Sequence, residues 1–190
     1  MKLKQYLALA IFVVLAMATA GASQDSMHQH QHDDKQGGKP DEAGKKSHPH
    51  AERLDGVNAR GDKAMGFSHT RATHHFRLTR DGGMVEVTAN DPKDTESSDM
   101  IKKHLELISR LFAEGDFAKP LMTHGKMPPG VEVMTRMKSE IAYKYEDMGR
   151  GGRVRISTKN PEALAAIHEF LRFQIQDHQT GDSLEVEPEK

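Results

Sequence analysis

The sequence contains no cysteine and no tryptophan, and aromatic residues make up only 5% of its 190 residues. The absence of cysteine excludes disulfide bonds, thiolate catalysis and cysteine-based zinc sites. It also excludes a lipid anchor attached to a cysteine behind an export signal. Histidine and methionine, which occur 12 and 11 times, are therefore the soft metal ligands that this chain has available.

The sequence also lacks an apolar run of the roughly 20 residues that a membrane-spanning helix needs. Its longest apolar stretch, residues 6–17, follows two lysines and leads into the small residues 18–23. This layout is typical of a cleavable secretory signal, with cleavage after Ala20 or Ala22. We therefore predict a signal peptide over residues 1–22 and a periplasmic or secreted protein without stable membrane insertion after cleavage. An uncleaved membrane anchor is the alternative.

The chain has no large charge of either sign. Its formal net charge is −1, and removal of Lys2 and Lys4 with the signal takes it to −3. This balance predicts no nucleic-acid partner and no affinity for anionic membranes. Catalytic motifs of the G-x-S-x-G, H-E-x-x-H and Walker types are missing too. We therefore predict no catalytic residue, and an unrecognised enzyme is kept only as an alternative.

The composition changes along the chain. Residues 23–62 are rich in His, Gln, Asp, Gly and Lys and hold few large apolar residues, so we predict a disordered tail that cannot form a core. Residues 63–183 are sufficient for one domain. Residues 184–190 read as an acidic C-terminal tail.

The domain shows one pattern of apolar residues twice. Alternation over residues 74–79 and 84–89 predicts two strands joined by a turn, and helical spacing over 95–113 predicts a helix. The second pattern has strands over 141–146 and 153–157 and a helix from Pro161 to about His178, with a short helix over 131–138 between the two. The sequence therefore predicts an α+β domain of duplicated ββα units, which form a four-stranded antiparallel sheet with two helices on one face.

The predicted tail carries closely spaced histidines. Imidazole is a good ligand for copper and zinc, and alternating histidines on a flexible chain can wrap around one ion. The alternative is a polar spacer without a ligand. The candidate ligands in this tail are His28, His30, His32, Asp33, His48 and His50.

The domain offers two further groups of candidate ligands. His74 shares the inward strand positions, while His104 and His168 occupy equivalent places beside the apolar stripes of the two long helices, so the three can form one site. Alternatively, each is a histidine at the edge of the core with a backbone partner. A second group combines imidazole and thioethers suited to Cu(I), although such methionines also fill core gaps: Met122, His124, Met127, Met134 and Met137.

Three stretches of the domain resemble a family of small exported bacterial proteins of unestablished function. They run from Met65-Gly66-Phe67 to Thr73-His74-His75-Phe76, over Pro128-Pro129-Gly130-Val131, and from Asn160-Pro161-Glu162-Ala163-Leu164 to Thr180-Gly181-Asp182. Members of the family are sometimes labelled aspartate carbamoyltransferase. This chain has neither the Ser-Thr-Arg-Thr phosphate loop nor the His-Pro-x-Gln motif of those enzymes. The resemblance therefore implies no mechanism and no site residues.

These observations favour an exported metal-binding protein that collects copper or zinc. The histidine-rich tail collects the metal, and His and Met side chains of the domain are further candidate ligands. The rival hypothesis is a protein-interaction or assembly module with structural histidines, for which a homodimer formed through open sheet edges is plausible.

Overall fold

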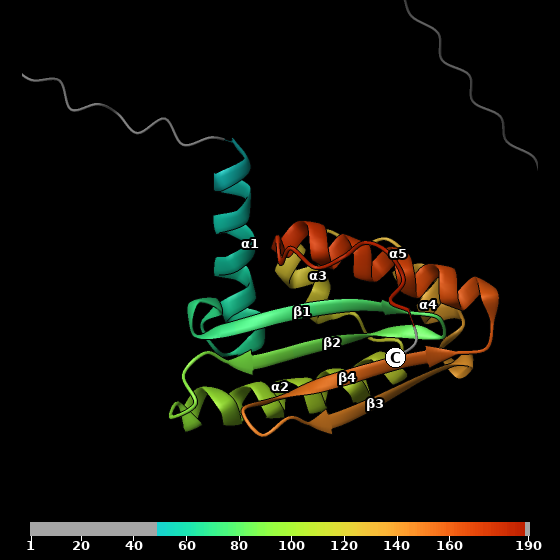
Figure 1. Cartoon of the computed structure of the whole chain (residues 1–190). Helices are drawn as coiled ribbons and strands as arrows, with labels where there is room; N and C mark the ends of the chain where they lie inside the picture. Colours follow the sequence, from blue (N-terminus) through green and yellow to red (C-terminus); the bar gives the residue numbers. More distant parts are fainter. Residues whose placement is uncertain (1–48, 189–190) are drawn as a thin grey trace, which may run out of the picture. The chain divides into compact units, whose positions relative to one another are not determined.

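The computed structural model describes residues 49–188, which contain five α-helices and one β-sheet (Figure 1). The elements in chain order are α1 (Pro49–Met65), η1 (His69–Arg71), β1 (Ala72–Thr79), β2 (Gly82–Ala89), α2 (Thr95–Ala113), α3 (Ala118–His124), α4 (Val131–Arg136), η2 (Lys138–Glu140), β3 (Ile141–Asp147), β4 (Gly151–Thr158) and α5 (Pro161–His178).

The four strands form an antiparallel sheet in the order β1-β2-β4-β3. The two hairpins meet at β2 and β4, where Val85 lies opposite Val154. This confirms the predicted α+β class and the predicted four-stranded antiparallel sheet. Because side chains alternate between the faces of a strand, the register brings Phe76 of β1, Val85, Val154 and Tyr145 of β3 onto one face. That face carries the core.

The Gly82-Gly83 and Gly151-Gly152 pairs fall between the strands that the sequence predicts, but both lie within strands. Gly83 lies beneath α5, and a Cβ atom there would come within 2.2 Å of Leu171 Cδ1 and 2.4 Å of the Arg77 carbonyl oxygen. At Gly152 a Cβ atom would come within 2.6 Å of Tyr145 Cε2 and 3.2 Å of Leu105 Cδ1 of α2. Gly83 and Gly152 therefore leave room for the side chains packed above them, and the turns are made by the residues before the glycine pairs.

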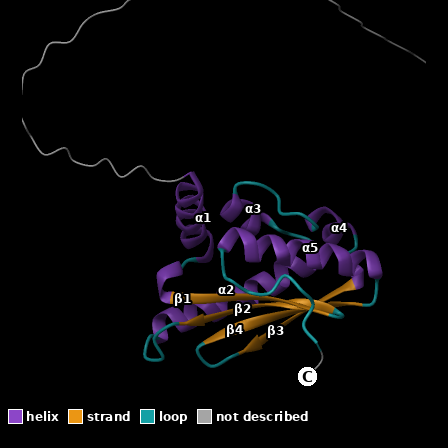
Figure 2. Cartoon of the chain, turned by 45° about the horizontal axis from the view of Figure 1, so that its top comes forward, coloured by secondary structure: helices purple, strands orange, loops and turns teal. Residues whose placement is uncertain are grey.

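The two long helices begin where polar caps predict. Asp94 accepts a hydrogen bond from the Ser97 amide at 3.0 Å at the start of α2. Asn160 accepts hydrogen bonds from the amides of the first turn of α5. Proline occupies the first position of this helix, where a backbone N–H would have no partner within the helix. Helix α2 packs on β3 and β4, and α5 packs on β1 and β2. Figure 2 shows α3, α4 and α5 grouped together.

Helix α1 shows that part of the predicted disordered tail is helical. Residues 49–62 were assigned to a disordered segment, yet they form most of this helix, which rises from one end of the sheet in Figure 1. Val57 and Ala64 are buried, at 1% and 2% exposure, and α1 packs on α3 and α5. The helix buries only a narrow stripe, so its composition resembles that of a linker.

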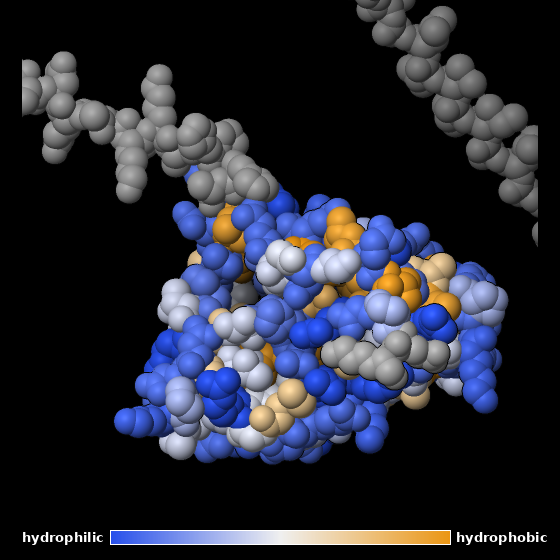
Figure 3. Space-filling view, viewed as in Figure 1, coloured by the Kyte–Doolittle hydropathy of each residue, from blue (hydrophilic) through white to orange (hydrophobic). Residues whose placement is uncertain are grey.

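The C-terminal segment also contacts the sheet. Val186 forms a parallel bridge with Leu78, and the Glu187 amide donates to the Leu78 carbonyl oxygen at 2.9 Å. Part of the predicted acidic tail thus covers the free edge of β1. The face of the molecule in Figure 3 is mostly hydrophilic, with hydrophobic side chains in separate patches. Within residues 49–188, no helix is long and apolar enough to cross a membrane.

Candidate functional site

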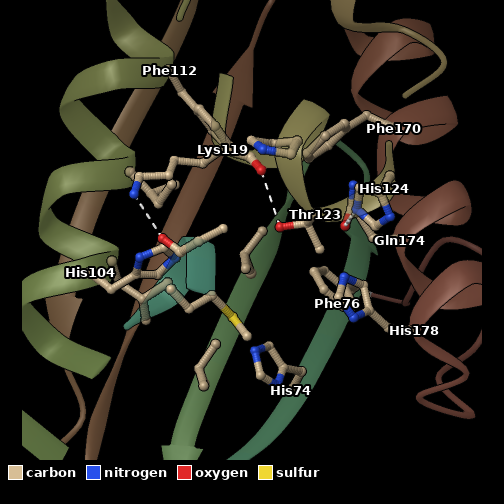
Figure 4. Close-up of a pocket in the computed structure, with 17 residues that line it drawn as sticks. His74, Phe76, His104, Phe112, Lys119, Thr123, His124, Phe170, Gln174 and His178 are labelled. Atoms are coloured by element: carbon tan, nitrogen blue, oxygen red, sulfur yellow. Dashed lines mark hydrogen bonds between the residues drawn. The ribbon is translucent and has the colours of Figure 1, made fainter. Parts of the chain in front are cut away.

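An inner cavity of about 70 Å³ lies between the core face of the sheet and the helices α2, α3 and α5, with the last turn of α1 closing one side. Its walls are mainly apolar, as in most small-ligand sites. Figure 4 shows the polar side chains that project into it from different elements. They are His74, His104, Lys119, Thr123, His124, Gln174 and His178.

Three of the four domain histidines predicted as metal ligands line this cavity. They are His74 on β1, His104 on α2 and His124 on α3. The fourth, His168, does not: its Nε2 donates to the backbone carbonyl oxygens of Thr79 and Gly82, at 2.9 and 3.0 Å. For His168, the structural role at the edge of the core is therefore the correct one. His178, one turn beyond Gln174 on α5, lines the cavity instead.

Three of the imidazole rings form a contiguous group. His74 and His178 stack with centroids 5.8 Å apart and planes at 6°, and His124 meets His178 edge-on at 5.0 Å. A metal lies about 2.0 Å from a coordinating nitrogen, and that nitrogen about 1.1 Å from its ring centre, so two imidazoles that share an ion have centroids at most about 6 Å apart. Both pairs satisfy this distance limit, but a metal lies in the plane of each imidazole that binds it, so the parallel rings of His74 and His178 must turn before both can face one ion. His104 lies across the cavity (Figure 4), where it meets Phe67 edge-on.

His124 is fixed by a buried polar network. Its Nδ1 is hydrogen-bonded to Asp177 Oδ2 at 2.7 Å, and its Nε2 is hydrogen-bonded to the Gln174 side chain at 2.9 Å. Arg53 of α1 binds the other carboxylate oxygen of Asp177. Burial raises the pKa of Asp177, but hydrogen bonds from His124 and Arg53 outweigh this effect and hold the pKa below its ordinary value. Because both ring nitrogens are occupied, His124 supports the neighbouring ring and leaves ligation to others.

The remaining cavity histidines are neutral at physiological pH. Burial is the main cause that lowers the pKa of His74 and His104 to about 4 and that of His178 to about 3. Neighbouring basic groups contribute to this lowering, while Asp62 opposes it at His74 and Asp177 opposes it at His178. Among the described residues, His74 Nε2 is one of a few buried side-chain nitrogen or oxygen atoms without a hydrogen-bond partner. A neutral imidazole with a free nitrogen is the form that binds a metal.

An outer cleft of about 350 Å³ lies beside α1, between that helix, β1 and the end of α5. Met65, His74 and His178 line both this outer cleft and the inner cavity, so they form the partition between the two spaces. No Asp or Glu lines either space. Lys119, whose Nζ donates to the Ala64 carbonyl oxygen at 2.8 Å, adds a positive charge to the inner wall.

The predicted cluster of methionines around His124 is divided by the fold. Met134 is fully buried in the core, whereas Met122 and Met127 are 55% and 49% exposed. Met137 packs against the core from outside the cavity. These side chains therefore do not share one site with His124. Met65, which lies at the end of α1, is the methionine that lines the cavity.

The predicted tail ligands His28, His30, His32, Asp33 and His48 lie outside the described residues, as does the predicted signal peptide. His50 belongs to the first turn of α1. Within the described part of the chain, no group of three or more His, Cys, Asp or Glu side chains is placed to hold a metal ion.

Sequence reasoning missed several residues of this site. His178 continues the apolar stripe of α5 three positions after Ile175, but it was not predicted as a ligand. Asp177 gave no local signal, because its partners Arg53 and His124 are 124 and 53 positions away. Lys119 and Met65 were missed because the helices that carry them were not predicted.

No protein-family model, no curated protein and no solved structure matches this chain.

Proposed function

We propose that this chain is an exported metal-binding protein whose domain takes up a transition metal ion such as copper or zinc. The observation that carries the proposal is the convergence of His74 and His178, with His124 packed against them, on one small cavity. The neutral imidazoles of His74 and His178 supply borderline-soft ligands for one ion. Structural histidines need no such convergence, and His168 shows how one is satisfied by backbone alone.

In this proposal the tail collects metal and the domain holds it. The tail candidates precede α1 in the sequence or, for His50, lie in its first turn, and the last residues of that helix, Ala64 and Met65, line the inner cavity. A histidine-rich segment gives modest affinity and little selectivity, which suits capture outside the cytoplasm. The signal over residues 1–22 would bring the protein to that compartment.

Calorimetric titration of the chain lacking residues 1–22 with Zn(II) tests this proposal. We expect a tight site and weaker additional sites. Replacing the tail histidines by glutamine should remove the weaker sites only, and H74Q/H178Q should remove the tight site only. Absence of a tight site, or a tight site that survives H74Q/H178Q, contradicts uptake by the domain.

A second candidate function is assembly into a homodimer through β3, which ends the sheet on the side away from β1. Lys144 and Glu146 alternate along this strand, so antiparallel pairing of two β3 strands about Tyr145 places Lys144 of each copy opposite Glu146 of the other. Opposite charges at facing positions stabilise a strand pair. Light scattering of metal-free protein tests this: K144E should give a monomer and K144E/E146K should restore the dimer. A wild-type monomer contradicts it.

We also propose that the domain consists of two ββα repeats with both long helices on one face of the sheet. The pairing supports this, because Gly83 lies opposite Ile156 while Gly152 lies opposite Val87, symmetrically about the Val85–Val154 pair. A circular permutant opened at Lys126, between the two units, is expected to unfold cooperatively, and its failure to fold would contradict the proposal.

A further inference from the structure

We propose that the domain site is specific for copper(I), with His74, His178 and the thioether of Met65 as its ligands at the floor of the outer cleft. This inference rests on the proposed metal-binding function and deepens it. The three side chains are the partition between the inner cavity and the outer cleft. An ion held by them is reached from the cleft and is shielded on its other side by the core.

The distance between the two histidines allows a shared ion. Their ring centroids lie 5.8 Å apart, within the limit for two imidazoles on one metal. The rings are nearly parallel, so they must turn out of this stack to direct one nitrogen each at the ion. His74 Nε2 is buried without a hydrogen-bond partner, which is unfavourable unless a ligand satisfies it. His124, fixed by Asp177 and Gln174, packs edge-on against His178. His124 therefore acts as a positioning residue for His178.

The charge of the site favours a monovalent ion. None of the residues lining the inner cavity or the outer cleft carries a carboxylate, and Lys119 places a positive charge on the inner wall. Asp177 and Asp62 lie behind this lining, where they are hydrogen-bonded to His124 and His69. The unfavourable free energy of burying an ion rises with the square of its charge and is relieved by anionic ligands. Neutral ligands in apolar surroundings therefore penalise Zn(II) and Cu(II) far more than Cu(I).

The ligand types favour the same ion. Thioether sulfur is a soft donor that selects Cu(I) among biological metals, and imidazole binds Cu(I) as well. A low coordination number also suits a site with three ligands. The proposed ligand set consists of two histidines and one methionine. It is therefore consistent with the absence, among the described residues, of a metal-binding group of three His, Cys, Asp or Glu side chains.

The decisive experiment is anaerobic competition of the chain lacking residues 1–22 with a chromophoric Cu(I) chelator. The tail histidines are replaced by glutamine, so that only domain sites remain. We expect one Cu(I) per chain. M65L keeps the side-chain volume, and we expect it to weaken Cu(I) binding at least about tenfold, since loss of an outer-shell partner alone typically has that effect. H74Q should weaken binding at least as much.

Two control variants match these changes. M122L alters an exposed methionine of α3, and H69Q alters a histidine that lines the outer cleft but bonds to Asp62. Both should leave Cu(I) affinity within about twofold. X-ray absorption of the copper(I) complex gives a second readout, because a copper–sulfur distance present in the wild type should be lost in M65L. Circular dichroism confirms that each variant is folded.

The outcomes separate this inference from the proposed function. Unchanged Cu(I) affinity in M65L, or no copper–sulfur distance, overturns the ligand set. Tight Zn(II) binding that depends on His74, with weaker Cu(I) binding, overturns the copper specificity but leaves the proposed metal-binding function intact. Absence of both Cu(I) and Zn(II) binding overturns both.

Discussion

Asp177 is a carboxylate held almost completely out of water, with an exposure of 3%. It is stable there because it accepts hydrogen bonds from His124 and Arg53 on two other elements. Removing one member of such a buried pair leaves the other without compensation. Asp177 therefore links α1, α3 and α5 at the rim of the site.

The first prediction concerns this link. D177N is expected to lower the free energy of unfolding by about 3 kcal/mol, because the Asn side chain has no charge to balance Arg53 and only one oxygen to accept the hydrogen bonds that both carboxylate oxygens accept. Urea denaturation at neutral pH measures this change. D99N, which alters an exposed carboxyl group of α2, serves as the control and should change the free energy by less than about 0.5 kcal/mol. Equal stability of the two variants would contradict the structural role of Asp177.

The second prediction concerns acid stability of the metal-free protein. The pKa values of His74 and His104 are lowered to about 4 and that of His178 to about 3, from an ordinary value of 6.5. Protons therefore bind the unfolded chain first as pH falls. The stabilisation from these groups is complete above pH 6.5 and is lost progressively, by about 1.4 kcal/mol per pH unit for each neutral histidine. The loss continues to about pH 4 for His74 and His104 and to about pH 3 for His178.

Urea denaturation at a series of pH values between 7.5 and 4.5 tests this dependence. H104L removes one of the three groups, and its free energy of unfolding should fall less steeply with decreasing pH than that of the wild type. The lowered pKa values of Asp177 and Asp182 act only at lower pH, near the ordinary aspartate range. An unchanged slope in H104L would show that His104 is not buried in its neutral form.

The sequence predicted the histidine site only in part, for a physical reason. His74 could be placed facing the core because strand parity is strict. His104 and His168 appear equivalent in a helical pattern, yet only His104 faces the cavity. His168 lies where the β1–β2 turn exposes two carbonyl oxygens, and local spacing cannot show what a distant turn offers.

At the scale of elements, the close contact of α5 with β2 depends on Gly83. The third prediction is that G83A lowers the free energy of unfolding by about 3 kcal/mol, because the added methyl group meets Leu171 and the Arg77 carbonyl oxygen, and overpacking of a core costs about 1–3 kcal/mol or more. Thermal unfolding followed by circular dichroism measures it.

A glycine-to-alanine substitution in α1, G56A, is the control, and we expect it to change the free energy of unfolding in the opposite direction. At Gly56 an added Cβ meets only the flexible end of Arg60. Alanine there favours the helix by about 0.8–1.0 kcal/mol relative to glycine. G56A should therefore be as stable as the wild type or more so. A destabilised G56A would show that the helical conformation of this segment does not contribute to folding.

The elements differ in how well their sequences predict them. Helices α2 and α5 and all four strands were predicted, because each buries a regular apolar face whose period is visible in the sequence. Helix α1 was missed because Val57 and Ala64 are among few apolar residues in a polar segment. Helix α3 was missed because Pro120 interrupts it, and its burial depends on contacts with α1 and α5 that lie far away in the sequence.

At the scale of the whole molecule, the two proposed kinds of metal site differ in their link to folding. A histidine-rich tail binds metal in the same way whether or not the domain is folded. The domain site exists only when β1, α1 and α5 are assembled. A ligand stabilises a protein only when it binds the folded state more tightly than the unfolded state.

The fourth prediction follows from this difference. Addition of Cu(I) at about 100 times its dissociation constant should stabilise the folded domain by about 2.7 kcal/mol, which raises the melting temperature by about 5–10 °C for a chain of this size. Replacing the tail histidines should leave this increase unchanged, and H74Q/H178Q should abolish it while the tail still binds metal. If instead the increase disappears with the tail histidines, the metal is held outside the domain, and the convergence of histidines on the inner cavity serves only to stabilise the fold.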